Sequence, residues 1–237
     1  EKTSFARDVS RGALNVMLSE LRMLESSNAL VTITDKRLTF RAPYAMGVSC
    51  GTSGGSTIVS RVPTDSVMFR TAQISGYGFR NSAGNYTYQA TTTAPASGTA
   101  VTCTNNRVRT IPSDSGGRVL ALSPANAGAT PGLPVLLYQT ITYEFRASTL
   151  VPGRIALWRT VENSSPLRTE ELVAPFDTTA RFRYYVADSL TPDSITPAAS
   201  AAITGVELTL NGMSERPDRS GKRPRVPLVT SVFFRNR

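Results

Sequence analysis

Apolar residues near the start of the chain recur at the period of an α-helix. Successive members of the series are four, four, four, four and three positions apart, in the order Phe5, Val9, Ala13, Met17, Leu21 and Leu24. Leu14 and Leu18 widen this stripe, while arginines such as Arg7 and Arg22 fall on another face. The pattern predicts one amphipathic helix over residues 1–27, whose apolar side must pack against another part of the protein.

From residue 30 onward the period changes from that of a helix to that of a strand. The clearest alternation runs over 141–146, where Ile141, Tyr143 and Phe145 share one face and polar residues share the other. A turn at 150–153 and a return strand over 154–159 complete a predicted hairpin. Further strands are expected at these places: 31–33, 37–41 with Pro43 ending that run, 182–186, 206–210 and 228–237.

Two segments are less regular than the strands around them. Residues 165–175 are expected to hold one helical turn, with Glu170 and Glu171 as a solvated pair on a surface turn. Residues 44–130 have a weak pattern rich in Gly, Ala and Thr, which is typical of a variable insertion. The predicted fold is therefore α+β: the helix 1–27 packs on the antiparallel sheets of a β-rich head over 28–237.

Composition agrees with a chain of many short strands. Apolar residues make up 40% of the 237 positions and charged residues 18%, which fits one β-rich domain of generous size or two small ones. No run approaches the roughly 18–20 apolar residues that a membrane-spanning helix needs. Because the chain opens inside the predicted helix, we expect a further segment upstream of it.

The two cysteines lie in turn-prone sequence of extracytoplasmic character. Cys50 stands beside the glycine-rich stretch 51–55, and Cys103 lies in the threonine-rich middle region. An even number of cysteines in such a setting predicts one disulfide between them, and two reduced thiols are the alternative. The spacing fits neither a zinc site nor a thioredoxin-like motif.

The absence of histidine restricts the possible chemistry. Residues 51–55 (GTSGG) and 113–117 (SDSGG) resemble the nucleophile loop of trypsin-like proteases, with Ser53 or Ser115 as the nucleophile. Such a loop needs a histidine to take the serine proton, so both are interpreted as glycine-rich turns. None of Lys2, Lys36 and Lys222 has the buried setting that would activate a serine.

No cofactor site is expected either. A phosphate-binding loop and a dinucleotide fingerprint are both missing from the sequence. Asp188, Asp193 and Asp218 fall in loops without EF-hand spacing, so we interpret them as ordinary loop aspartates and not as calcium ligands. We predict that the chain is not an enzyme and holds no cofactor or metal.

Positive charge gathers in one predicted loop. The net charge is +9, and residues 215–225 (ERPDRSGKRPR) contain five basic side chains: Arg216, Arg219, Lys222, Arg223 and Arg225. An exposed arginine loop of this kind can hold DNA phosphates without reading the base sequence. The alternative is a solvated hairpin tip, since charge runs usually belong to solvated surface, and both interpretations stay open.

The C-terminal half resembles the minor pilins of type IV pili and the J-type pseudopilins of type II secretion. The order of several short segments carries the resemblance: TYEF (142–145), RIALWR (154–159), LVAPF (172–176), ARFRYY (180–185), ITGVELTL (203–210) and SVFFRN (231–236). The similarity covers 135–237 and, in outline, 1–41, but not the middle region. The sequence lacks the family's hydrophobic N-terminal segment with its early glutamate.

The resemblance implies a structural subunit of an envelope filament. A missing apolar helix would anchor it in the inner membrane, with the head in the periplasm and later in the pilus or pseudopilus. Phe5, Val9, Met17, Leu21 and Leu24 would join the helix to the head, and the partners would be other pilin subunits and, for a pilus that takes up DNA, DNA. A pseudopilin of type II secretion and a soluble nucleic-acid-binding module are the alternative functions.

Overall fold

The fold was analysed on a computed structural model. It describes residues 11, 15, 17–62, 72–91, 96–97, 103, 108, 118–187, 189–193, 196–197, 200–214, 217–218, 220–223 and 225–234. The chain divides into two compact units: unit 1 comprises Glu1–Arg41 and Ile141–Arg237, and unit 2 comprises Ala42–Thr140. The interval 44–130 that the sequence marked as an insertion lies inside unit 2.

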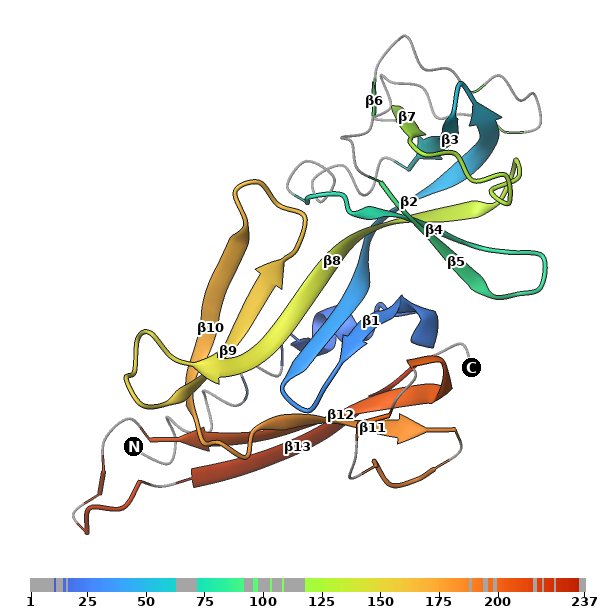
Figure 1. The fold of residues 1–237 in the computed structure, drawn as a ribbon. Helices are drawn as coiled ribbons and strands as arrows, with labels where there is room; N and C mark the ends of the chain where they lie inside the picture. The colour runs from blue at the N-terminus through green and yellow to red at the C-terminus, as the bar shows by residue number, and fades with distance from the viewer. Residues whose placement is uncertain are drawn as a thin grey trace. The chain divides into compact units, whose positions relative to one another are not determined.

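Antiparallel strands dominate the described part of the chain (Figure 1). Thirteen strands are linked by hydrogen bonds, and two of them, β2 and β8, contribute residues to both units. The strands, in chain order, are β1 (Leu30–Ile33), β2 (Arg37–Ser53), β3 (Ser56–Arg61), β4 (Gly76–Arg80), β5 (Tyr86–Ala90), β6 (Ala96–Ser97), β7 (Arg118–Leu122), β8 (Pro134–Ala147), β9 (Ile155–Val161), β10 (Arg168–Phe176), β11 (Arg181–Val186), β12 (Ile203–Met213) and β13 (Arg225–Phe233).

The α+β prediction is wrong. Among the described residues, α-helical backbone is confined to Arg11, Asn15 and 17–21, with two short 3-10 turns at Ser27–Ala29 and Ser200–Ala202. Strands outnumber these positions many times, so the described part of the chain is a β protein; within 17–27, α-helical backbone ends at Leu21. Apolar periodicity alone predicts a helix's face but not its length, and short helices depend on tertiary packing for their stability.

Unit 1 contains the hairpin predicted most clearly from the sequence. β8 and β9 pair from Ile141 with Val161 to Ala147 with Ile155, which confirms this prediction. β10 then pairs with the other edge of β9, so the helical turn expected over 165–175 is wrong. The strand was missed because its first half is exposed on both faces and therefore does not alternate.

The core of unit 1 lies between β8–β10 and the three antiparallel strands β11, β12 and β13. Phe145 of β8 contacts two rings across this core, with ring centroids 5.8 Å from Phe176 and 5.1 Å from Phe182. Phe40 of β2 stacks on Tyr143 at 6.0 Å. The alternation of Phe182, Tyr184 and Val186 thus places aromatic side chains inward, as strand periodicity predicts.

Unit 2 packs a separate core. Its strands pair in the order β8, β2, β3, β7 and β6, with β4 and β5 added on β8. The buried side chains are Ala45, Val59, Tyr77, Phe79, Leu120, Leu122, Ala129, Val135 and Leu137. β2 continues through Pro43, contrary to the prediction, because a proline removes one donor but its φ is compatible with extended backbone. Gly54 and Gly55, both with positive φ, make the β2–β3 turn expected from the glycine-rich stretch.

Candidate functional site

A short N-terminal segment of unit 1, residues 17–24, packs its apolar side chains completely; we call it the docking segment. Met17 and Leu21 are 0% exposed, and Leu24 and Leu18 are also buried. Met17, Leu21 and Leu24 therefore lie where the apolar stripe would place them. Phe5 and Val9, the other predicted packing residues, lie outside the described residues.

A carboxylate in the docking segment is held by two side chains of the sheet. An oxygen of Glu20 lies 2.7 Å from a guanidinium nitrogen of Arg159, and the Tyr143 hydroxyl donates to the other oxygen at 2.7 Å. The Glu20 and Arg159 side chains are each only 17% exposed. Charge-assisted bonds of this kind are stronger than neutral ones, so Glu20 fixes the segment to β8 and β9.

Burial and the charge of Glu20 shift the pKa values of Tyr143 and Arg159. Burial is the main cause that raises the pKa of Tyr143, and the nearby Glu20 carboxylate raises it further. Burial alone would lower the pKa of Arg159, but the hydrogen bond and charge of Glu20 outweigh it and raise that pKa. Tyr143 is therefore a neutral donor and Arg159 a cation at neutral pH.

The cluster extends to the acidic pair that the sequence placed on a surface turn. That assignment is wrong, since both residues belong to β10. Glu170 is 61% exposed and lies 3.5 Å from Arg159. Glu171 accepts hydrogen bonds from the Thr149 backbone N–H at 2.8 Å, from the Thr149 hydroxyl at 2.7 Å and from the Ser148 hydroxyl. The pair thus bonds to two neighbouring elements and is not merely solvated.

Lys36 also has a defined role that the sequence did not indicate. Its ammonium donates to the carbonyl oxygens of Thr178 at 2.8 Å and of Ala180 at 2.5 Å. Burial is the main cause that lowers its pKa, partly opposed by the Asp35 charge. Lys36 therefore ties the β1–β2 turn to the β10–β11 turn.

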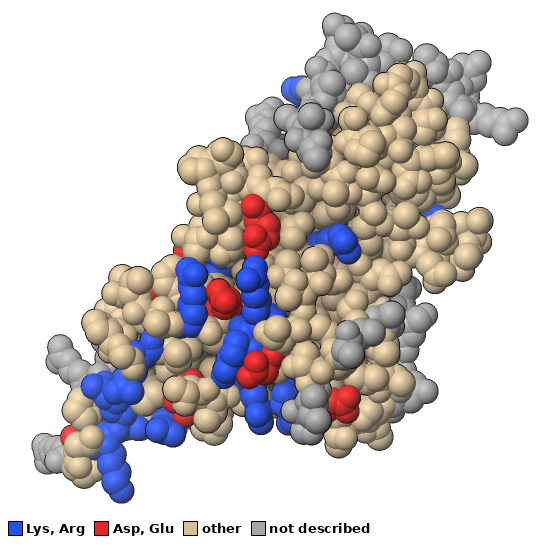
Figure 2. Space-filling view, in the orientation of Figure 1, with Lys and Arg blue, Asp and Glu red and all other residues tan. Residues whose placement is uncertain are grey.

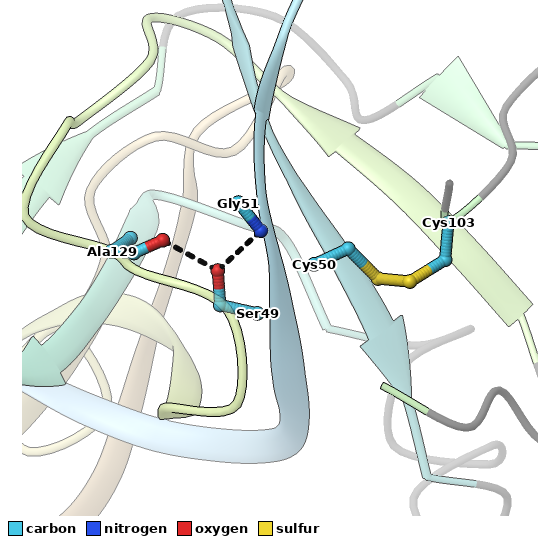
Figure 3. The surroundings of a disulfide bond; sticks show 5 residues. All are labelled: Ser49, Cys50, Gly51, Cys103 and Ala129. Carbon is cyan, nitrogen blue, oxygen red and sulfur yellow. Dashed lines mark hydrogen bonds between the residues drawn. A yellow bond between two sulfur atoms is a disulfide. The ribbon is translucent and has the colours of Figure 1, made fainter. Parts of the chain in front are cut away.

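In unit 2, Cys50 and Cys103 form the predicted disulfide, with Cα atoms 5.5 Å apart (Figure 3). Cys50 sits at a register shift of β2, between Ser49 and Gly51. The Ser49 hydroxyl donates to the Ala129 carbonyl at 2.6 Å and accepts from the Gly51 N–H at 3.0 Å. The bond links chain positions 53 residues apart and fixes Cys103 to a strand of the core.

The structure describes only part of the predicted basic loop 215–225. Arg216 and Arg219 lie outside the described residues. Arg225 pairs with Asp177 at 3.1 Å, Arg223 donates to the Ser214 carbonyl at 3.3 Å, and Lys222 is exposed. Two of the three described side chains thus have partners within the protein. Nucleic-acid binding by these five residues stays a prediction.

The structure describes only some of the serine motifs and loop aspartates singled out in the sequence. Ser53 lies in the exposed β2–β3 hairpin, whereas Ser115 and Asp188 are outside the described residues. Within the described ranges, no group of three or more Cys, Asp or Glu side chains is arranged to hold a metal ion. Asp218 accepts from the backbone N–H groups of Ser220 and Lys222, so it shapes its own turn.

Glu20, Tyr143 and Arg159 are the residues that the sequence reasoning missed. One signal was present: Arg159 stands at an inward position of its strand, where Leu157 and Val161 are buried on either side. A charged residue at a buried strand position requires a partner. The partner lies 139 positions away, and no local pattern identifies it.

Comparisons with known proteins add no further constraint. No protein-family model matches the sequence, and neither a curated protein nor a solved structure matches it. Over the residues that the structure describes, no helix combines the length and the apolar character needed to cross a membrane.

Proposed function

We propose that the chain is a non-catalytic structural subunit of a bacterial envelope filament, of the minor-pilin kind, with its β-rich body outside the cytoplasm. The proposal does not need the α+β layout, which the structure contradicts. It needs an N-terminal segment that is firmly joined to a β body, because a filament subunit must transmit force between its anchor and its exposed part.

The observation that carries the proposal is the attachment of the docking segment. Four apolar side chains of residues 17–24 are buried, and Glu20 is bonded to both Arg159 and Tyr143. Burial of such side chains is worth roughly 1.5–3 kcal/mol each. A segment held in this way resists being pulled from the body, as the attachment of an anchored subunit requires.

Two further features support an extracytoplasmic role. The Cys50–Cys103 disulfide is typical of proteins that fold in an oxidising compartment. The order of the β8–β13 sequences resembles that of minor pilins and J-type pseudopilins. That the chain has no catalytic activity stays a prediction, which rests on the absence of histidine from the sequence.

The test is made in the native host with the complete gene. We expect the protein in the inner-membrane fraction and in sheared filaments, and we expect deletion of the gene to reduce filament number. Loss of surface pili would indicate a pilus subunit, whereas loss of secretion with intact pili would indicate a pseudopilus. A deletion strain with normal filaments and normal secretion would overturn the proposal.

A point variant tests whether filament assembly needs the attachment of the docking segment and not only the presence of the protein. Glu20→Gln removes the charge that holds Arg159, so we expect fewer filaments at an unchanged protein level. Glu25→Gln is the matched control, because it changes a carboxylate in the same part of the chain without touching Arg159 or Tyr143. Equal loss of filaments in both variants would contradict the role given to Glu20.

A further inference from the structure

One end of unit 1 presents an apolar loop tip. The β8–β9 loop carries Leu150, whose side chain is 75% exposed, next to the exposed Pro152 and the partly exposed Val151. We call residues 149–152 the apolar tip.

The framework keeps the tip extended. Glu171 of β10 accepts from the backbone and hydroxyl of Thr149, and the Val151 N–H donates to the Ser148 hydroxyl at 2.8 Å. The Arg154 N–H donates to the Val151 carbonyl at 3.2 Å. These bonds fix the loop backbone, so Leu150 cannot fold back onto the sheet without breaking them.

Basic side chains also belong to this end of unit 1. Arg154 directly follows the loop, and its neighbour Ile155 pairs with Phe176. Asp177 comes next, and it binds Arg225. The β12–β13 hairpin with Lys222 and Arg223 thus ends on the same side of unit 1 as the β8–β9 loop (Figure 1).

The acids at this end each have partners within the protein, including Glu171, which accepts from Thr149 at the tip itself. Asp177 binds Arg225 and accepts from the Thr179 N–H, and Asp218 accepts from the N–H groups of its own turn. Among the described residues, no ion pair joins Arg154 or Lys222 to an acid. In Figure 2 blue side chains gather over this part of unit 1. An apolar tip with a basic rim is complementary to an anionic bilayer, which offers phosphates at its surface and hydrocarbon below.

We propose that this end of unit 1, formed by the apolar tip with Arg154 and Lys222, docks on the surface of an anionic lipid bilayer. Leu150 enters the interfacial region while the basic side chains bind lipid phosphates. Duplex DNA fits less well, because its phosphates offer no apolar environment for Leu150. This inference is independent of the proposed filament function.

Co-sedimentation with vesicles tests the proposal on the purified, disulfide-bonded chain. We expect binding to phosphatidylcholine vesicles that contain phosphatidylglycerol, weak binding to phosphatidylcholine alone, and release at high salt. Leu150→Ser should lower partitioning about tenfold by removing the apolar anchor. Arg154→Gln with Lys222→Gln should lower it about tenfold as well and should remove most of the salt dependence.

The opposite end of the same strands provides a matched control. The β9–β10 loop carries Leu167, 58% exposed, beside the exposed Arg168. Leu167→Ser and Arg168→Gln should leave vesicle binding unchanged, and near-ultraviolet circular dichroism should show that all variants fold alike. The proposal is overturned by equal losses in both pairs, by binding that ignores phosphatidylglycerol, or by Leu150→Ser binding like the unaltered chain. Binding to duplex DNA at least as tight as to the vesicles also overturns it.

Discussion

The two units of this protein stabilise β-sheets by different means. Unit 1 contains 35 charged residues among its 138 positions, and unit 2 only 8 among 99. Six ion pairs between described residues belong to unit 1: Arg37–Glu162, Arg146–Glu144, Arg159–Glu20, Arg159–Glu170, Arg183–Glu207 and Arg225–Asp177. Figure 2 shows the same contrast, with red and blue side chains concentrated over unit 1.

Among the described residues of unit 2, neutral hydroxyl groups and one covalent bond supply contacts of another kind. The Tyr77 hydroxyl donates to the Pro124 carbonyl at 2.8 Å, and the Thr91 hydroxyl donates to the Ser123 carbonyl at 2.6 Å. The Cys50–Cys103 disulfide joins two positions 53 residues apart in the chain. The comparison teaches that a unit with few charged residues can hold its described strands and loops together with hydroxyl-to-backbone hydrogen bonds and a cross-link.

The largest expected effect is the loss of the disulfide. The double variant Cys50→Ser with Cys103→Ser should destabilise unit 2 by about 4 kcal/mol, because the unfolded chain regains the freedom of a long loop. Hydrogen exchange followed by mass spectrometry should show faster exchange in peptides of 42–140.

Peptides of 141–237 provide the internal control for this variant, and we expect their exchange to change little. Equally faster hydrogen exchange in both units would show that the cross-link stabilises the whole chain, which would contradict the contrast between the two units.

The next largest effect concerns the ion pair of the docking segment. Arg159→Met leaves the mostly buried Glu20 carboxylate without its cation, so we expect a loss of about 3 kcal/mol in the free energy of unfolding of unit 1. Urea denaturation followed by the fluorescence of Trp158, the only tryptophan, measures it.

The double variant Arg159→Met with Glu20→Met tests the cause. It should recover a large part of the loss, because no unpaired charge remains buried. A double variant as unstable as the sum of the two single variants would mean that packing of the arginine stem, and not its charge, matters.

A third effect is a loss of stability at alkaline pH, which we expect in both units. Burial raises the pKa of Tyr143 and Tyr184 in unit 1 and of Tyr44 in unit 2 above the ordinary value of 10.0. Above that value the unfolded chain loses these protons while the folded chain keeps them, so stability is full below pH 10 and falls as the pH rises. We expect about 1 kcal/mol per tyrosine by pH 11, measured by denaturation across pH.

Tyr143→Phe refines this test. The variant should reduce the loss of stability of unit 1 at alkaline pH and leave the loss of stability of unit 2 unchanged. A pH profile identical to that of the unaltered chain would exclude Tyr143 as a contributor.

The smallest effect sharpens the contrast between buried and exposed ion pairs. Arg37 and Glu162 lie 3.4 Å apart with side chains 46% and 29% exposed. Glu162→Gln should cost less than about 1 kcal/mol, and added salt should remove most of that difference. A loss as large as that of Arg159→Met would contradict the view that burial decides the strength of these pairs.

The strands of unit 1 were largely predictable, because one of their faces is buried and the alternation is visible. Residues 141–146 and 154–159 are the clearest case, and they form a hairpin as expected. β10 was not predictable, since its exposed first half removes the alternation that identifies a strand. Within the described residues 17–27 the predicted helix ends early, at Leu21, because apolar periodicity predicts the buried face of a helix and not its end.

The candidate site was less predictable than the fold. Its apolar members Met17, Leu21 and Leu24 follow from periodicity. Glu20 with Arg159, and Lys36 with its two carbonyls, join positions more than 130 residues apart. Such pairs depend on tertiary structure, and local propensity carries no information about them.

Lys36 has a consequence for how this sequence can vary among related chains. Its acceptors at positions 178 and 180 are main-chain oxygens, which every amino acid supplies. We therefore expect an alignment of homologues to keep the lysine fixed while both acceptor positions drift freely. Covariation methods would miss this contact completely, although it joins two turns of the molecule.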